Sequence, residues 1–133
     1  MILVDTSVWI DLFSRTPRHY LAPEAWPRLA TCGPVIQEVL QGARDQAFQR
    51  LRDGMLALPR LGDPVDIDLY LEAASLYRHA RQKGYTVRSS VDCLIAAVAM
   101  RCEATVWHAD RDFEAIGKFA ALRTLVARSL PMH

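Results

Sequence analysis

The sequence predicts an α/β domain in which a parallel sheet is sandwiched between helices (α/β/α). Apolar segments of strand length alternate along the chain with longer segments of helical periodicity, as in a parallel sheet covered on both faces. The first segment, Met1–Val4, is apolar at every position, which is expected of a strand buried on both faces. The length of 133 residues suits one domain, residues 1–133, and the hydrophobic fraction of 51% is enough for its core.

The N-terminal half begins with a strand, a polar turn and a helix. The turn Asp5–Ser7 ends the apolar run with residues suited to cap a helix, and apolar residues between 8 and 13 recur at helical spacing. A segment with three prolines follows, and we expect it to be a loop or short helix. Beyond it we expect a strand at Leu29–Cys32, helices at Val35–Gln41 and Asp45–Met55, and a third strand at Ala57–Leu61.

The C-terminal half continues the alternation. The pattern predicts a long helix at Asp66–Lys83, an apolar helix at Ser90–Cys102, a strand at Ala104–Trp107, a helix at Asp112–Phe119 and a last strand at Leu122–Val126. Because ligands of such folds bind outside the carboxyl ends of the strands, acids that directly follow a strand are expected to share a site. Asp5 and Asp110 both occupy such positions.

Composition and charge narrow the class of protein. The formal net charge of +1 lacks the basic excess of many nucleic-acid binders, although an acidic cluster can mask basic surface elsewhere. Three cysteines without C-x-x-C spacing argue against a disulfide framework and for a reducing compartment. Asp5 interrupts the N-terminal apolar run, and no basic segment precedes it, so we expect no signal peptide. The expected location is the cytoplasm.

Asp92 stands out because it lies beside the apolar face of the predicted helix Ser90–Cys102. Burial of a lone carboxylate costs several kcal/mol unless the group is paired or binds a metal. Its position in the first helical turn recovers only about 0.3–1 kcal/mol. A cation is therefore expected beside Asp92, either a metal ion or a basic side chain such as Arg88.

The other acids have more ordinary interpretations when each is taken alone. Asp5 can be a helix N-cap, and Glu38 can simply extend to solvent from the edge of its helix. Asp110 and Asp112 form an Asp-x-Asp pair, of which we expect Asp110, the acid closer to the strand end, to point into the site. Asp112 is expected to cap the next helix or to support Asp110. A neighbouring histidine, His108, is either a ligand or a packed side chain.

Taken together, the four acids Asp5, Glu38, Asp92 and Asp110 predict a metal site. Several carboxylates at one edge of a sheet repel one another unless a cation neutralises them. Oxygen ligands select Mg²⁺ or Mn²⁺ rather than zinc, and such an ion supports hydrolysis of a phosphodiester. No serine-hydrolase or nucleotide-binding motif is present. A receiver domain or a haloacid-type phosphohydrolase would need a second acid close to Asp5, which the sequence lacks.

Four segments carry a resemblance to a known family, in the order Val4–Leu12 (VDTSVWIDL), Pro34–Gly42 (PVIQEVLQG), Ser89–Ala97 (SSVDCLIAA) and His108–Ile116 (HADRDFEAI). Together they resemble PIN-domain proteins and, more narrowly, the VapC toxins of bacterial toxin–antitoxin pairs. The resemblance implies a homodimer, Mg²⁺- or Mn²⁺-dependent endonucleolytic cleavage of tRNA or ribosomal RNA, and a VapB-like antitoxin whose C-terminal segment blocks the site. It also implies roles for the four acids, with Asp5, Asp92 and Asp110 as metal ligands, Glu38 acting through water, and Thr6 or Ser7 supporting Asp5.

RNA binding needs cations near the acids. Arg88 and Arg111 are close to them in sequence and are the RNA-binding candidates, whereas the basic residues of 78–83 also fit a solvated helix face. The non-enzyme alternative is a catalytically silent PIN-like binding module.

Overall fold

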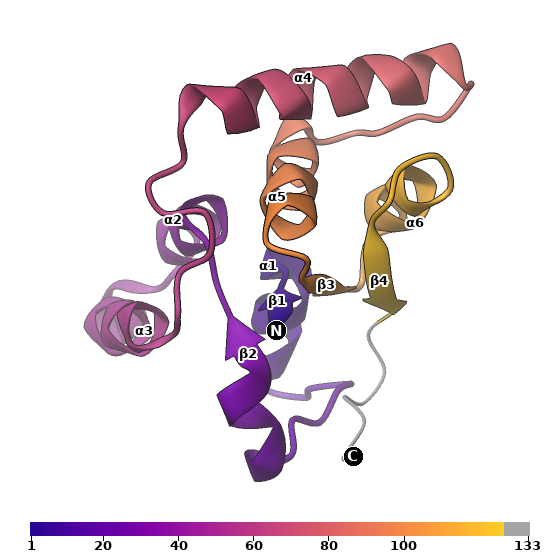
Figure 1. The fold of residues 1–133 in the computed structure, drawn as a ribbon. Coiled ribbons are helices and arrows are strands. Elements are labelled where there is room, and N and C mark those ends of the chain that lie inside the picture. Colours follow the sequence, from indigo (N-terminus) through magenta and orange to yellow (C-terminus); the bar gives the residue numbers. More distant parts are fainter. Residues whose placement is uncertain (127–133) are drawn as a thin grey trace.

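The computed structural model describes residues 1–126, and these residues form a four-stranded sheet in the order β2-β1-β3-β4 (Figure 1). The strands are β1 (Ile2–Val4), β2 (Leu29–Ala30), β3 (Thr105–His108) and β4 (Arg123–Val126). All three strand pairs are parallel, as predicted. β1 and β3 are the central strands, and their pairing places Val4 opposite Trp107.

Helices flank the sheet, and α5 packs between the sheet and an outer helix, α4. The helical elements are α1 (Thr6–Leu12), the 3-10 helix η1 (Pro23–Arg28), α2 (Gly33–Gln41), α3 (Asp45–Ala57), α4 (Ile67–Gln82), α5 (Ser90–Arg101) and α6 (Arg111–Gly117). Figure 1 shows α4 lying across α5 at the periphery. The predicted α/β/α arrangement is therefore confirmed. No helix within residues 1–126 has the length and apolarity to span a bilayer.

The core explains why the central strands are apolar throughout. Leu3, Val4, Val106 and Trp107 are fully buried, because both faces of β1 and β3 are covered. The segment Ile95–Ala99 of α5 is also buried at every position. A helix that is apolar on all sides fits such a place between a sheet and a second helix.

The structure corrects one predicted strand and one predicted helix start. The third strand predicted at Ala57–Leu61 is wrong, because α3 runs on to Ala57 and only an isolated bridge joins Arg60 to Thr31. Pro59 has no N–H to extend a ladder. The last helix begins at Arg111 rather than at Asp112, because Asp110 is its N-cap.

Candidate metal-binding acidic site

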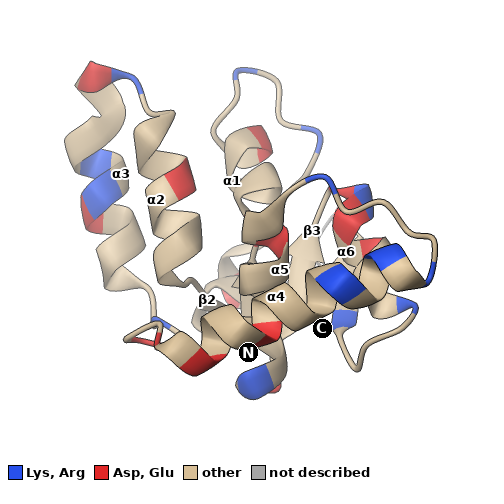
Figure 2. Ribbon diagram, turned by 90° about the horizontal axis from the view of Figure 1, so that it is seen from above, with Lys and Arg blue, Asp and Glu red and all other residues tan. Residues whose placement is uncertain are grey.

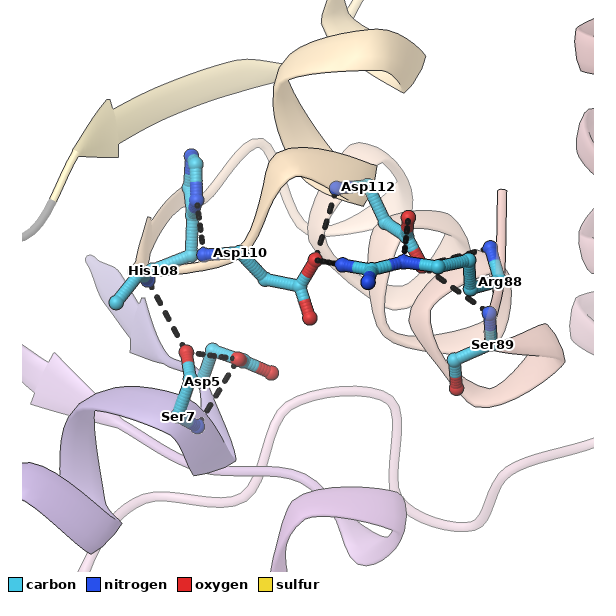
Figure 3. A network of polar contacts seen from close by, with 8 residues as sticks. Asp5, Ser7, Arg88, Ser89, His108, Asp110 and Asp112 are labelled. Atoms are coloured by element: carbon cyan, nitrogen blue, oxygen red, sulfur yellow. Dashed lines mark hydrogen bonds and ion pairs between the residues drawn. The ribbon is translucent and has the colours of Figure 1, made fainter. Parts of the chain in front are cut away.

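The candidate site lies at the carboxyl ends of the two central strands. Asp5 directly follows β1, and its backbone N–H donates to the Trp107 carbonyl of β3 at 2.9 Å. Asp110 comes two residues after β3 ends. Figure 3 shows the side chains of Asp5 and Asp110 close to each other at this edge. The position is the one expected of a ligand site in a parallel sheet.

Asp5 is held in place by Ser7. One carboxylate oxygen of Asp5, Oδ2, accepts from the backbone N–H of Ser7 at 3.1 Å and from its hydroxyl at 2.5 Å, so Asp5 is the N-cap of α1. The same hydroxyl accepts from the N–H of Ala109 at 3.0 Å, which ties α1 to the segment after β3. The other oxygen, Oδ1, is buried and has no hydrogen-bond partner among the described residues. Burial raises the pKa of Asp5.

Asp92 lies in the first turn of α5 and is 5% exposed. Its Oδ2 atom is buried without a hydrogen-bond partner among residues 1–126. Burial raises the pKa of Asp92 to about 9, with further contributions from the charge of Asp5 and from hydrogen bonding to Asp112. The expected alternative of an ion pair with Arg88 is not formed, since the guanidinium of Arg88 lies against Asp110 and Asp112.

Asp110 and Asp112 both face Asp92. Within the described part of the chain, these three acids form a group that offers carboxylate oxygens within 4.8 Å of one another. The expectation that Asp110 alone points into the site is therefore wrong. Residues two apart on an extended strand share a face, so strand alternation does not separate Asp110 from Asp112. Asp110 caps α6 and accepts from the N–H of Asp112, which lies in the first turn of that helix.

Asp112 also holds the segment that leads into α5, a role that the sequence analysis missed. Its Oδ2 atom accepts from the backbone N–H of Arg88 at 3.0 Å and of Ser89 at 3.1 Å. Asp112 is 2% exposed, and Figure 3 shows its carboxylate beside both residues. The Asp-x-Asp spacing was the available signal, but the distance of more than twenty residues between Asp112 and its partners hid this contact.

Two of the predicted site acids, Asp5 and Glu38, lie outside the three-acid group, as does His108. Glu38, half-buried on α2, accepts from the Thr6 hydroxyl at 2.9 Å, which places it beside the start of α1. His108 accepts at Nδ1 from the N–H of Asp110 at 3.2 Å, and its ring packs against Phe113 with 5.2 Å between centroids. Burial lowers the pKa of His108, which favours the neutral form of this packed ring.

These residues fit a hard divalent cation. The donors are carboxylate oxygens, and two of them, Asp5 Oδ1 and Asp92 Oδ2, are buried without any hydrogen bond from the described residues. Carboxylates gathered in this way need a cation to offset their repulsion. Nearby thiols do not compete for a soft metal, because burial raises the pKa of Cys32 to about 12 and that of Cys93 to about 11.

An apolar groove of about 760 Å³ lies among α1, α2, α3 and η1. Figure 2 shows α1, α2 and α3 side by side. Trp9, Phe13 and Trp26 form its aromatic end, with Phe13 stacked on Trp9 at 5.6 Å between centroids. The described lining includes three arginines and no acid. Val39, which follows Glu38 in sequence on α2, belongs to the lining.

Comparison with known proteins identifies the family. The model of the PIN domain matches residues 2–119. Ribonuclease VapC11 of Mycobacterium tuberculosis is 40% identical over 92% of this chain and 96% of its own. The chain therefore belongs to the PIN domain family and resembles its VapC members.

Two solved structures agree with this assignment. VapBC-5 of Mycobacterium tuberculosis, a member of the VapBC family of toxin–antitoxin systems, superposes with a TM-score of 0.61 and 27% identity over 95% of this chain and 96% of its own. VapC20 of the same organism, a sarcin-ricin loop cleaving toxin, gives a TM-score of 0.62 and 25% identity, covering 92% and 99%.

Proposed function

We propose that this chain, residues 1–133, is a PIN-domain endoribonuclease that depends on Mg²⁺ or Mn²⁺ and acts in the cytoplasm as the toxin of a toxin–antitoxin pair. The observation that carries the proposal is the gathering of carboxylates from the end of β1, the segment after β3 and the first turn of α5, where Asp5 and Asp92 each bury an oxygen that has no partner among the described residues. The identity of 40% to a protein named as a VapC ribonuclease supports the nuclease activity.

We assign the metal-binding role to Asp5, Asp92 and Asp110, with Glu38 acting through a water molecule. A bound Mg²⁺ or Mn²⁺ would polarise the scissile phosphoryl group and lower the pKa of a coordinated water. Ser7 fixes the rotamer of Asp5 through two hydrogen bonds. Thr6 orients Glu38 through its hydroxyl.

Arg88 and Arg111 are the side chains that we assign to the RNA backbone. Both are exposed and lie next to the acids, Arg88 before α5 and Arg111 at the start of α6. Basic groups at the rim of an acidic site offset the repulsion between its carboxylates and the phosphates of RNA. We propose tRNA or ribosomal RNA as the substrate class, which the activity of VapC20 on the sarcin-ricin loop supports.

Cleavage of labelled RNA tests the proposal. With Mn²⁺ present, wild type is expected to cut, and Asp5→Asn to cut at least ~100-fold more slowly, because each 1.36 kcal/mol lost from the transition state costs tenfold. Asp45→Asn, an exposed acid in the first turn of α3, is the control and should cut like wild type. Equal cleavage by wild type and Asp5→Asn would refute the assigned site.

The antitoxin is the partner that we assign to the apolar groove. Structures of VapBC pairs such as VapBC-5 support an antitoxin partner for this chain. The groove is apolar, carries Arg15, Arg44 and Arg50, and includes Val39, the sequence neighbour of Glu38. An amphipathic segment with acidic residues complements this lining, and its continuation would reach the acidic site.

Charge reversal at the groove tests this assignment. Arg50→Glu is expected to weaken binding of the antitoxin encoded beside this chain by about tenfold, because like charges at an interface repel. Arg52→Glu, on the same helix but outside the groove, is the control and should bind within about twofold of wild type. The measurement is the dissociation constant at low salt. Equal effects of the two reversals would refute the groove as the contact.

A homodimer is the oligomeric state that we propose, with the outer face of α4 as the contact. This face exposes Ile67 (70%), Leu71 (62%), Tyr70 and Tyr77 at helical spacing. A second copy of the chain would cover such a contiguous apolar stripe. Sedimentation equilibrium is expected to give a dimer for wild type and a monomer for Leu71→Glu. A wild-type monomer, or a dimer unaffected by the substitution, would refute this contact.

A further inference from the structure

The backbone of Arg88 is fixed by a hydrogen bond, whereas its guanidinium forms only long, weak contacts. Its backbone N–H donates to Asp112 at 3.0 Å, while its side chain is 60% exposed. The guanidinium atom Nη2 lies 3.7 Å from Asp110 Oδ1, and Nε lies 3.8 Å from Asp112 Oδ1. Both separations exceed the 2.7–3.2 Å of a well-formed hydrogen bond. The guanidinium is therefore a nearby counterion that can leave without breaking a strong bond.

The guanidinium lies against one carboxylate that we assign to the metal, Asp110, and against its neighbour Asp112. Asp110 and Asp112, its two partners, are two of the three acids that offer oxygens within 4.8 Å of one another. A monovalent side chain and a divalent ion cannot both sit against one oxygen without strong mutual repulsion. Competition between them follows from this geometry.

We propose that Arg88 is a built-in counterion of the acidic site, which gives way when a divalent cation binds and then faces the phosphate of the substrate. The planar guanidinium suits both roles, since it pairs with carboxylate and with phosphate. Asp112 fixes the backbone of Arg88 through a hydrogen bond, so only the side chain has to move between the carboxylates and the phosphate. This inference rests on the proposed metal-dependent nuclease function.

Arg111 provides a matched control. It is the residue after Asp110 and is exposed, but among residues 1–126 it forms no ion pair with the acids. Removal of either arginine lowers the local positive charge by one unit. A difference in Mn²⁺ affinity between the two variants therefore measures direct competition between Arg88 and the ion, and not the loss of one positive charge from the surface.

The experiment is calorimetric titration of metal-free protein with Mn²⁺ at low ionic strength. Arg88→Gln is expected to bind Mn²⁺ about five- to tenfold more tightly than wild type, and Arg111→Gln within about twofold. At saturating Mn²⁺, Arg88→Gln is also expected to raise the KM for RNA severalfold. Circular dichroism confirms that the variants fold.

The outcomes separate this inference from the proposed function. Unchanged or weaker Mn²⁺ binding by Arg88→Gln, or equal tightening by both variants, would overturn the counterion role and leave the metal site standing. A wild type that binds no Mn²⁺ would overturn the metal site and the counterion role together.

Discussion

Asp92→Asn is expected to melt at a higher temperature than wild type in metal-free buffer near pH 8, and to lose RNA cleavage. The carboxyl group of Asp92 is buried with an unpartnered oxygen, and its raised pKa means that folding at pH 8 must keep it protonated; the neutral amide isostere removes this cost. We expect a gain of about 1–2 kcal/mol, or roughly 3–8 °C in Tm. Cleavage should fall at least ~100-fold, because a metal ligand supplies several kcal/mol of transition-state stabilisation.

The pH dependence of stability gives the same prediction a second readout. Burial raises the pKa of Asp92 to about 9, whereas an unfolded Asp titrates at about 3.9. The folded state therefore holds a proton that the unfolded state releases between these values. The contribution of Asp92 to the free energy of unfolding is fully present below about pH 4 and is lost as the pH rises towards 9. Asp92→Asn should flatten this decline, leaving the smaller part that comes from the raised pKa of Asp5.

Asp45→Asn is the control for both readouts. Asp45 also lies in the first turn of a helix, α3, but is exposed. Its substitution should lower stability slightly through lost interaction with the helix dipole, by about 0.3–1 kcal/mol, and should leave cleavage unchanged. A wild type and an Asp92→Asn protein with the same melting curve at every pH would contradict the raised pKa of the buried Asp92 carboxyl group.

Mn²⁺ is expected to stabilise wild type strongly and Asp92→Asn only weakly. At about 100 times its Kd, a ligand that binds only the folded state adds about 2.7 kcal/mol, or roughly 10 °C in Tm. Because ligands must be deprotonated, the raised pKa of Asp92 predicts that Mn²⁺ affinity increases between about pH 6 and pH 8. Thermal melts with Mn²⁺ and with a chelator measure both effects. Equal stabilisation of wild type and Asp92→Asn would place the ion elsewhere.

The sequence predicted the sheet and the place of the site because both depend on short-range patterns. The all-apolar run before Asp5 required a central strand, and the pattern Ala104–Trp107 marked its neighbour. Parallel pairing then brought Asp5 and Asp110 to one edge. Asp92 could be singled out because a carboxylate beside an apolar helical face needs a partner.

The features that the sequence could not predict depend on contacts between segments far apart in the chain and on how the helices pack. The sequence pattern indicates a capping or supporting role for Asp112, whereas the structure places its carboxylate in one group with Asp92 and Asp110. Its contacts with the backbone of Arg88 and Ser89 link segments far apart in the chain. The groove among α1, α2, α3 and η1 arises from helix packing, which periodicity alone does not specify.

Cleavage of total cellular RNA by the purified, antitoxin-free protein tests the central claim most directly. The new 5′ ends are mapped by sequencing after incubation with Mn²⁺ and, in parallel, with a chelator. The account predicts discrete cleavage sites with Mn²⁺ that disappear with the chelator and with Asp5→Asn. Intact RNA under all conditions would instead support a catalytically silent binding module, and cleavage that persists with the chelator would contradict a metal-dependent acidic site.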